Sequence, residues 1–196
     1  MSSIFDTVMQ QMGGENLSRI SQQIGADESS TKTAVEAALP LLLGGLARNS
    51  AKPEGAASLG NALNEHRGGL LENLGALLGN PEAGPGAGIL GHIFGNRRSN
   101  VEEGVGKATG LDKQQIGKLL MMLAPIVMAA LARKASPRAD APQADGSLPN
   151  ILEQETREAA QKAPSGLGGL ISMLDRDGDG NPLNDLGGLG EMFGRR

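Results

Sequence analysis

The chain has 196 residues, of which 39% are hydrophobic and 20% charged, and its formal net charge is −4. It contains three phenylalanines but no tryptophan or tyrosine, two histidines and no cysteine. These figures exclude disulfides, thiolate zinc sites, iron–sulfur clusters, a cysteine nucleophile and a multi-histidine metal site. A sheet-rich core is disfavoured because strands depend on β-branched and aromatic side chains. The mild acidity argues against a nucleic-acid binder driven by charge.

The N-terminal residues Met1 to Asp6 show no basic stretch followed by an apolar one, so no secretory signal is predicted. The longest apolar run, Leu119 to Ala132, spans 14 residues and includes Pro125. It is shorter than the roughly 20 residues that cross a bilayer. We interpret the run as a buried core helix and expect a cytoplasmic protein without a transmembrane segment.

The sequence is internally repeated. Gly25 and Pro40 recur as Gly110 and Pro125, both at an offset of 85 residues. Two units of this size are expected to share one core, because each is marginal alone. Further matched segments are Ile4–Val8 with Ile89–Ile93, Ser58–Leu63 with Ser147–Leu152, and Gly68–Leu74 with Gly168–Leu174.

Helix ends are marked by local signals. Residues 16–24 carry apolar side chains at helical spacing, and Gly25 follows as a C-terminal stop. Asp27 is a predicted N-cap of the next helix. In the second copy Asp112 takes this place, and Gln115 completes a capping box.

The helices that follow these caps contain Pro40 and Pro125, each some thirteen residues inside its helix. A proline there removes one backbone hydrogen bond and crowds the preceding turn, at a cost of roughly 3 kcal/mol. Each helix must therefore kink or break in two, and the apolar flanks favour a buried, kinked helix. The fold prediction is all-α, a multihelical array of two pseudo-repeats with helix-turn-helix-like units, kinked central helices and a short C-terminal Asp-rich loop.

Glycine supplies 30 residues, about twice its usual share. Pairs such as Gly44–Gly45 would let helices approach closely. The predicted organisation is a first helical repeat over 1–80, a Gly/Pro hinge over 81–88, a second repeat core over 89–135, a linker over 136–149, the end of the second repeat over 150–174, a calcium-type loop over 175–186 and a C-terminal helix or tail over 187–196.

The segments that resemble enzyme motifs lack the structural context that those motifs require. The stretch Gly86 to Gly91 has the letters of a dinucleotide fingerprint, but no strand precedes it. His92 is predicted on a helix face and His66 in solvent, and neither has an evident partner for base catalysis. We therefore predict a non-enzyme, and the sequence indicates no small-molecule substrate.

The segment Val105 to Leu119 has the mid-turn glycine and apolar spacing of two helices that cross steeply. A DNA-associated regulator is thus the alternative function. A groove-reading helix needs exposed basic or amide side chains and phosphate anchors around it. The first copy does not offer a basic surface, and the overall positive charge is weak, so nucleic acid is disfavoured. The side chains offered are Lys113, Gln114, Gln115 and Lys118 in the second copy, and Glu28, Ser29, Ser30 and Lys32 in the first.

Near the C-terminus, Asp175, Asp177 and Asp179 occupy positions 1, 3 and 5 of a calcium loop, with Gly180 at position 6. Calcium prefers six to eight oxygen ligands, and the carbonyl of Asn181 at position 7 would add a fourth. Clustered carboxylates repel one another, and a bound cation relieves the repulsion. We predict a Ca²⁺ site here.

The second half of this loop is non-standard, because Leu186 stands where an EF-hand has a bidentate glutamate. Asp185, with help from Asn184, must close the shell instead. The alternative is an acidic, glycine-rich turn that caps a helix and binds nothing. The first repeat ends in Gly79-Asn80-Pro81 without carboxylates, so a turn alone does not require them. The predicted metal ligands are Asp175, Asp177, Asp179, Asn181 and Asp185.

The last residues form an apolar stripe that ends in two arginines. This stripe could dock on a protein partner or a sister subunit, or pack against its own domain. Association with a membrane surface is a third, weaker possibility. Electrostatic anchoring depends on clusters of basic residues, and the two closing arginines, Arg195 and Arg196, are too few to form one. The stripe consists of Leu186, Leu189, Met192 and Phe193.

The chain resembles a bacterial family of unknown function, the YidB-like family (domain of unknown function 937). The residues that carry the resemblance are Ile24-Gly25, Ala38 to Leu42, Gly88 to Gly95, Thr109 to Leu111, Leu123 to Pro125 and Asp175 to Gly180. Related sequences end the acidic segment in paired aspartates, where this chain has Asn184-Asp185. The resemblance implies an all-helical fold with repeated helix-turn-helix-like units and no established activity. We predict a bacterial, non-enzymatic binding or scaffold protein that binds protein partners or self-associates.

Overall fold

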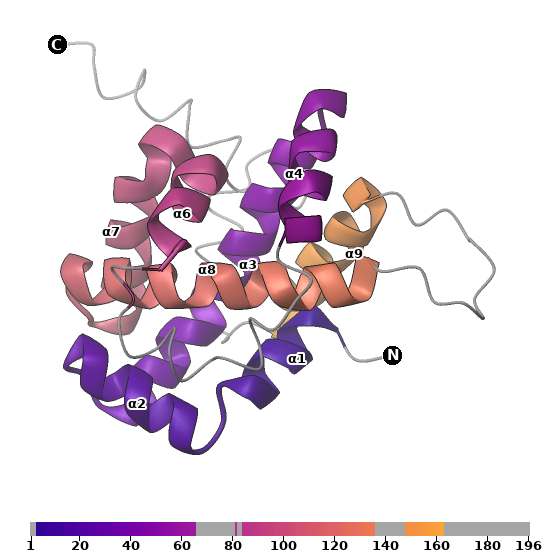
Figure 1. Ribbon diagram of the computed structural model, residues 1–196. Helices are drawn as coiled ribbons and strands as arrows, with labels where there is room; N and C mark the ends of the chain where they lie inside the picture. The colour runs from indigo at the N-terminus through magenta and orange to yellow at the C-terminus, as the bar shows by residue number, and fades with distance from the viewer. Residues whose placement is uncertain (1–2, 66–80, 82–83, 136–147, 163–196) are drawn as a thin grey trace, which may run out of the picture.

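The computed structural model describes residues 3–65, 81, 84–135 and 148–162. These residues form helices and connecting turns and contain no strand, so the all-α prediction is confirmed for them (Figure 1). The helices are α1 (Ile4–Gln11), α2 (Glu15–Ile24), α3 (Glu28–Ser50), α4 (Pro53–Glu65), α6 (Gly86–Phe94), the 3₁₀ helix η1 (Gly95–Arg97), α7 (Arg98–Thr109), α8 (Lys113–Ala135) and α9 (Leu148–Lys162).

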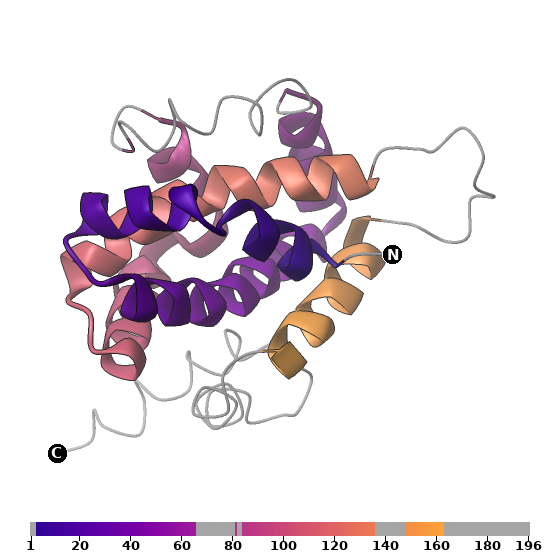
Figure 2. The ribbon, with the colours of Figure 1, turned by 90° about the horizontal axis from the view of Figure 1, so that it is seen from below.

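Helices α3 and α8 form the centre of the molecule. Helix α8 crosses the middle of the view in Figure 1, with α1 and α2 below it and α6 and α7 above it. Seen from below, α1 and α2 lie across both central helices (Figure 2). Helix α7 also contacts both, and α9 packs along α3. One apolar core therefore joins helices from Ile4 in α1 to Ala159 in α9.

The predicted cap signals are confirmed. Helix α2 ends at Gly25, whose φ of 72° is left-handed. The Asp27 carboxylate accepts a hydrogen bond from the Ser30 N–H at 2.9 Å. At the start of α8 the Gln115 N–H donates to the Asp112 carboxylate at 2.8 Å, and the Asp112 N–H donates to the Gln115 side chain at 2.9 Å. These bonds satisfy N–H groups that a helix leaves unpaired at its start.

Helix α3 continues through Pro40, and α8 continues through Pro125. A break of either helix into two is therefore wrong, and a kink stays a prediction. Both prolines are buried among apolar neighbours. Packing of the flanking side chains offsets the hydrogen bond that each proline removes.

Among the described residues, α8 is the one helix whose length and composition would suffice to cross a membrane. However, 83% of its most apolar window is buried inside the protein. The run Leu119 to Ala132 is thus a buried core helix, as predicted, and the helix itself extends to 23 residues.

Two helices begin earlier than the predicted organisation places them. Helix α6 begins at Gly86, inside the segment 81–88 predicted as a hinge, and α9 begins at Leu148, inside the predicted linker 136–149. A Cβ at Gly86 would collide with the backbone carbonyl of Met121 in α8. The first turn of α6 therefore lies directly on the α8 backbone, a long-range contact that a local reading of the glycines cannot reveal.

Candidate functional site

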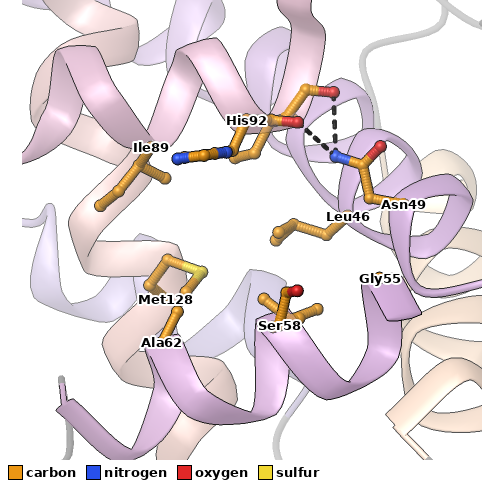
Figure 3. A pocket seen from close by; sticks show the side chains of 10 residues that line it. Leu46, Asn49, Gly55, Ser58, Ala62, Ile89, His92 and Met128 are labelled. Carbon is orange, nitrogen blue, oxygen red and sulfur yellow. Dashed lines mark hydrogen bonds between the residues drawn. The ribbon is translucent and has the colours of Figure 1, made fainter. Parts of the chain in front are cut away.

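A cavity of about 310 Å³ lies between α3, α4, α6 and α8 (Figure 3). Its walls are mainly aliphatic, and three polar side chains come to its edge. The aliphatic wall consists of Leu46, Leu59, Ala62, Ile89, Ile93 and Met128 with Gly55, and the polar side chains are those of Asn49, Ser58 and His92.

The wall formed by α6 is fixed by contacts with α3. The Asn49 amide donates hydrogen bonds to the backbone carbonyls of His92 at 2.5 Å and Ile93 at 3.3 Å (Figure 3). These carbonyls lie in the last turn of α6, which has no intrahelical donors for them. One turn earlier in α3, a Cβ on Gly45 would lie 2.5 Å from the Ile93 Cγ2 atom. Only glycine therefore permits this close approach of the two helices.

Ser58 on α4 and His92 on α6 lie on facing walls of the cavity (Figure 3). Both side chains are exposed. Within the part of the chain that the structure describes, neither the hydroxyl nor the imidazole forms a hydrogen bond. They are therefore available to a molecule that enters the cavity. The placement of His92 on a helix face is confirmed, whereas His66 lies outside the described residues.

Two arginines, Arg48 in α3 and Arg97 in η1, lie near each other. Burial, followed by the nearby guanidinium of Arg97, lowers the pKa of Arg48 below its usual value. The residues that line the cavity include no aspartate or glutamate. The lining therefore offers a cation no carboxylate to bind.

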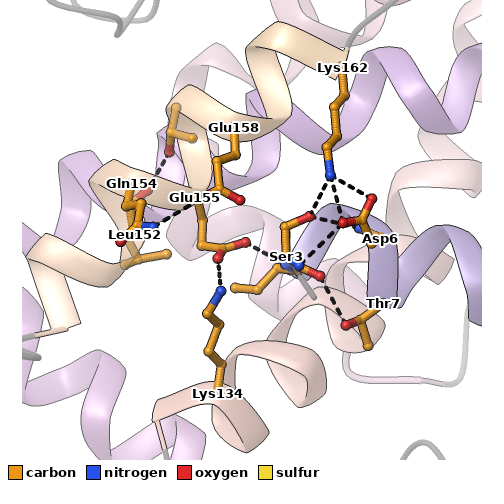
Figure 4. Close-up of polar contacts among 11 residues, drawn as sticks. Ser3, Asp6, Thr7, Lys134, Leu152, Gln154, Glu155, Glu158 and Lys162 are labelled. Carbon is orange, nitrogen blue, oxygen red and sulfur yellow. Dashed lines mark hydrogen bonds and ion pairs between the residues drawn. The ribbon is translucent and has the colours of Figure 1, made fainter. Parts of the chain in front are cut away.

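A second polar cluster joins α1, α8 and α9 on another side of the molecule (Figure 4). The Glu155 side chain is 1% exposed; its carboxylate pairs with the Lys134 ammonium and accepts a hydrogen bond from the Ile4 N–H. Lys162 Nζ lies 2.6 Å from both carboxylate oxygens of Asp6. This hydrogen bond, followed by one from the side chain of Ser3, holds the pKa of Asp6 below its usual 3.8.

The polar cluster has a structural role: it links α9 to α1 and α8, and each of its two paired carboxylates already has a cationic partner. Among the residues that the structure describes, no group of three or more histidine, aspartate or glutamate side chains could hold a metal ion. The predicted calcium ligands lie outside the described residues. They are Asp175, Asp177, Asp179, Asn181 and Asp185.

The helix-turn-helix-like segment contains a turn between two helices, and their steep crossing stays a prediction. Helix α7 ends at Gly110, whose φ of 76° is left-handed, and α8 follows. Lys113 is exposed and donates to the Ser99 hydroxyl at 2.6 Å. Gln115 is engaged in the capping box and also donates to the Gly25 carbonyl at 3.0 Å. Beyond its first turn α8 is largely buried, so little of it could enter a DNA groove.

Sequence reasoning missed the cavity. Its lining residues come from four helices between positions 46 and 128, and each looks like an ordinary core or surface residue. The one local signal is the glycine pair Gly44–Gly45, which predicted a close helix approach and lies where α3 meets α6.

A family model described as "Bacterial protein of unknown function (DUF937)" matches residues 6–134. This range contains the whole cavity lining and stops before α9. No curated protein and no solved structure matches the chain. Because the match covers well over half of the sequence, the chain belongs to this bacterial family of proteins of unknown function.

Proposed function

We propose that this chain is a non-enzymatic binding protein whose ligand site is the cavity between α4 and α6. The observation that carries the proposal is an aliphatic cavity of about 310 Å³ with two unengaged polar side chains at its walls. Ligand sites are typically concave, mostly apolar and about 300–1,000 Å³ in volume, with a few polar groups that orient the ligand.

The proposed duplication of the chain supports this assignment. Helix α8 begins and ends 85 residues after α3. Near the same offset α6 corresponds to α1, and α9 follows α8 as α4 follows α3, at a larger offset. The α1–α9 pair is closed by Asp6, Lys162 and the buried Glu155. At the offset of 85, Asp6 corresponds to Gly91, which has no side chain to form such a bond. Side-chain contacts thus join α1 to α9, whereas the cavity separates α4 from α6.

The chemistry of the lining favours binding over catalysis. A serine nucleophile requires a base within hydrogen-bond reach and a third group that orients the base. Ser58 and His92 lie on facing walls, and the described lining residues offer no carboxylate to orient the imidazole.

The ligand site can be tested with N-phenyl-1-naphthylamine, a neutral fluorophore that brightens in apolar surroundings. Ala62→Phe fills the cavity from α4, and Ala57→Phe adds the same bulk at an exposed position of the same helix. We expect saturable fluorescence for the native chain and Ala57→Phe, and at least tenfold weaker binding for Ala62→Phe with unchanged circular dichroism. Absence of saturable binding, or equal binding by the two variants, would refute the assignment.

For the C-terminal segment the proposal is a non-standard Ca²⁺ loop, supported by the spacing of its carboxylates. The adjoining apolar stripe 186–193 would then contact a protein partner or a second copy in the cytoplasm. Calorimetric titration with calcium should release or absorb heat, and calcium should raise the Tm relative to EDTA. A chain that shows neither effect does not bind calcium.

The alternative proposal is a DNA-associated regulator, supported by the turn at Gly110 between α7 and α8. A mobility shift that weakens steeply with salt would support it, since phosphate contacts release counterions. The burial of α8 leads us to expect no such shift.

A further inference from the structure

We propose that the ligand of this cavity is a medium-chain monocarboxylic acid, its alkyl chain among the aliphatic walls and its carboxylate between Ser58 and His92. The inference rests on the proposed ligand site and specifies its chemistry. The volume of the cavity, its two free donors and the lack of acidic side chains in its lining support it.

The size and lining of the cavity fit a short alkyl chain. A volume of about 310 Å³ lies at the lower end of the range for ligand sites, roughly 300–1,000 Å³, and suits a medium-length alkyl chain such as that of octanoate. Leu46, Leu59 and Ile93 are buried and present apolar surface from three different helices. Met128, with its flexible thioether, adapts the floor of the cavity to the chain.

The polar end of the ligand must accept hydrogen bonds. The Ser58 hydroxyl and an imidazole N–H of His92 are both donors, and they lie on opposite walls of the cavity (Figure 3). A carboxylate offers two oxygens and can accept from both walls at once. Hydrogen bonds to an ionised acceptor are roughly twice as strong as those to a neutral one.

The surroundings of the two donors suit an anionic head group. The lining residues include no aspartate or glutamate that would repel a carboxylate. The Asn49 amide covers the His92 and Ile93 carbonyls, which would otherwise repel it.

Displacement of N-phenyl-1-naphthylamine from the full chain tests the inference. Octanoate is compared with 1-octanol, which has the same alkyl chain and a neutral head group. We expect octanoate to displace the fluorophore at concentrations at least tenfold lower than octanol. His92→Phe, which removes the imidazole N–H, and Ser58→Ala should each weaken octanoate by fivefold or more and leave octanol unchanged. Ser29→Ala, an exposed serine on α3, is the matched control and should change neither.

The outcomes separate the two proposals. Equal displacement by octanoate and octanol, or insensitivity of octanoate to both His92→Phe and Ser58→Ala, overturns the carboxylate assignment and leaves the apolar site intact. A native chain that binds the fluorophore, but from which neither compound displaces it, also overturns the carboxylate assignment. A native chain that does not bind the fluorophore overturns both proposals.

Discussion

The carboxylate of Glu155 in α9 accepts a hydrogen bond from the backbone N–H of Ile4, the first residue of α1, 151 positions earlier. This N–H is one of four that a helix cannot satisfy internally at its start. The bond joins the two ends of the described fold. Helix α9 lies beyond the segment 6–134 that the family model matches, yet it completes the surroundings of α1 and covers α3.

Loss of the Glu155 carboxylate should destabilise the protein. Glu155→Ala leaves the Ile4 N–H and the Lys134 ammonium without their buried acceptor, a loss of about 1–3 kcal/mol. Urea denaturation followed by circular dichroism measures this difference. Glu153→Ala removes an exposed carboxylate 2.5 Å from Arg157 in the same helix and should change stability by less than about 0.5 kcal/mol. Similar losses for the two variants would contradict the role of Glu155.

Removal of α9 should abolish cooperative folding, because α9 covers much of α3. A chain that ends at residue 135 should bind 1-anilinonaphthalene-8-sulfonate and unfold over a broad temperature range. A chain that ends at residue 162 keeps α9 and is the control; it should unfold sharply. A sharp transition for the shorter chain would show that residues 6–134 form an independent domain.

Gly45 should not tolerate a side chain. Gly45→Ala places a Cβ 2.5 Å from the Ile93 Cγ2 atom between α3 and α6, and overpacking of this kind costs about 1–3 kcal/mol. Gly91→Ala is the matched control, because a Cβ there meets nothing within 4 Å. In a helix this replacement gains up to about 1 kcal/mol. Gly45→Ala should therefore lower the Tm of thermal unfolding, and Gly91→Ala should raise it. If both substitutions lower or both raise the Tm, the close approach of α3 and α6 is contradicted.

The Asp6–Lys162 pair should make stability depend on acidity. The pKa of Asp6 is lowered in the fold from its usual 3.8, so its contribution is present above that value and is lost as the pH falls through the lower, folded pKa. The side chains are 48% and 40% exposed, so the contribution is small and screened by salt. Asp6→Asn should lower the Tm at pH 7 in dilute buffer and have no effect at strongly acidic pH or in 1 M salt. A Tm difference that persists at strongly acidic pH would contradict the ion pair.

Local signals made part of this fold predictable. The caps at Asp27 and Asp112 and the stop at Gly25 depend on residues within four positions of one another, and all three are found where predicted. The all-α class followed from the scarcity of β-branched and aromatic residues. The run around Pro125 was identified as core because its flanks are apolar, and packing holds the helix together through the proline.

The remaining features depend on pairs of residues far apart in sequence. In the sequence Asn49 is simply a polar residue near a helix end. The carbonyls that it binds, those of His92 and Ile93, lie 43 and 44 positions later. Glu155 reads as one acid among several in a polar helix, and only its packing against α1 and α8 buries it. The cavity is the space left between helices, which no single segment encodes. The predicted calcium ligands lie outside the described residues, so that hypothesis depends on sequence spacing alone.

The pairing of α3 with α9 also affects synthesis on the ribosome. Translation must add the 97 residues between Ser50 and Leu148 before the helix that covers α3 can begin to emerge. At about 5–20 residues per second, this interval is roughly 5–20 s. Throughout it, the aliphatic side chains of α3 remain without their final cover in the nascent polypeptide. The core around α3 can therefore close only late in synthesis, once α9 has left the ribosome.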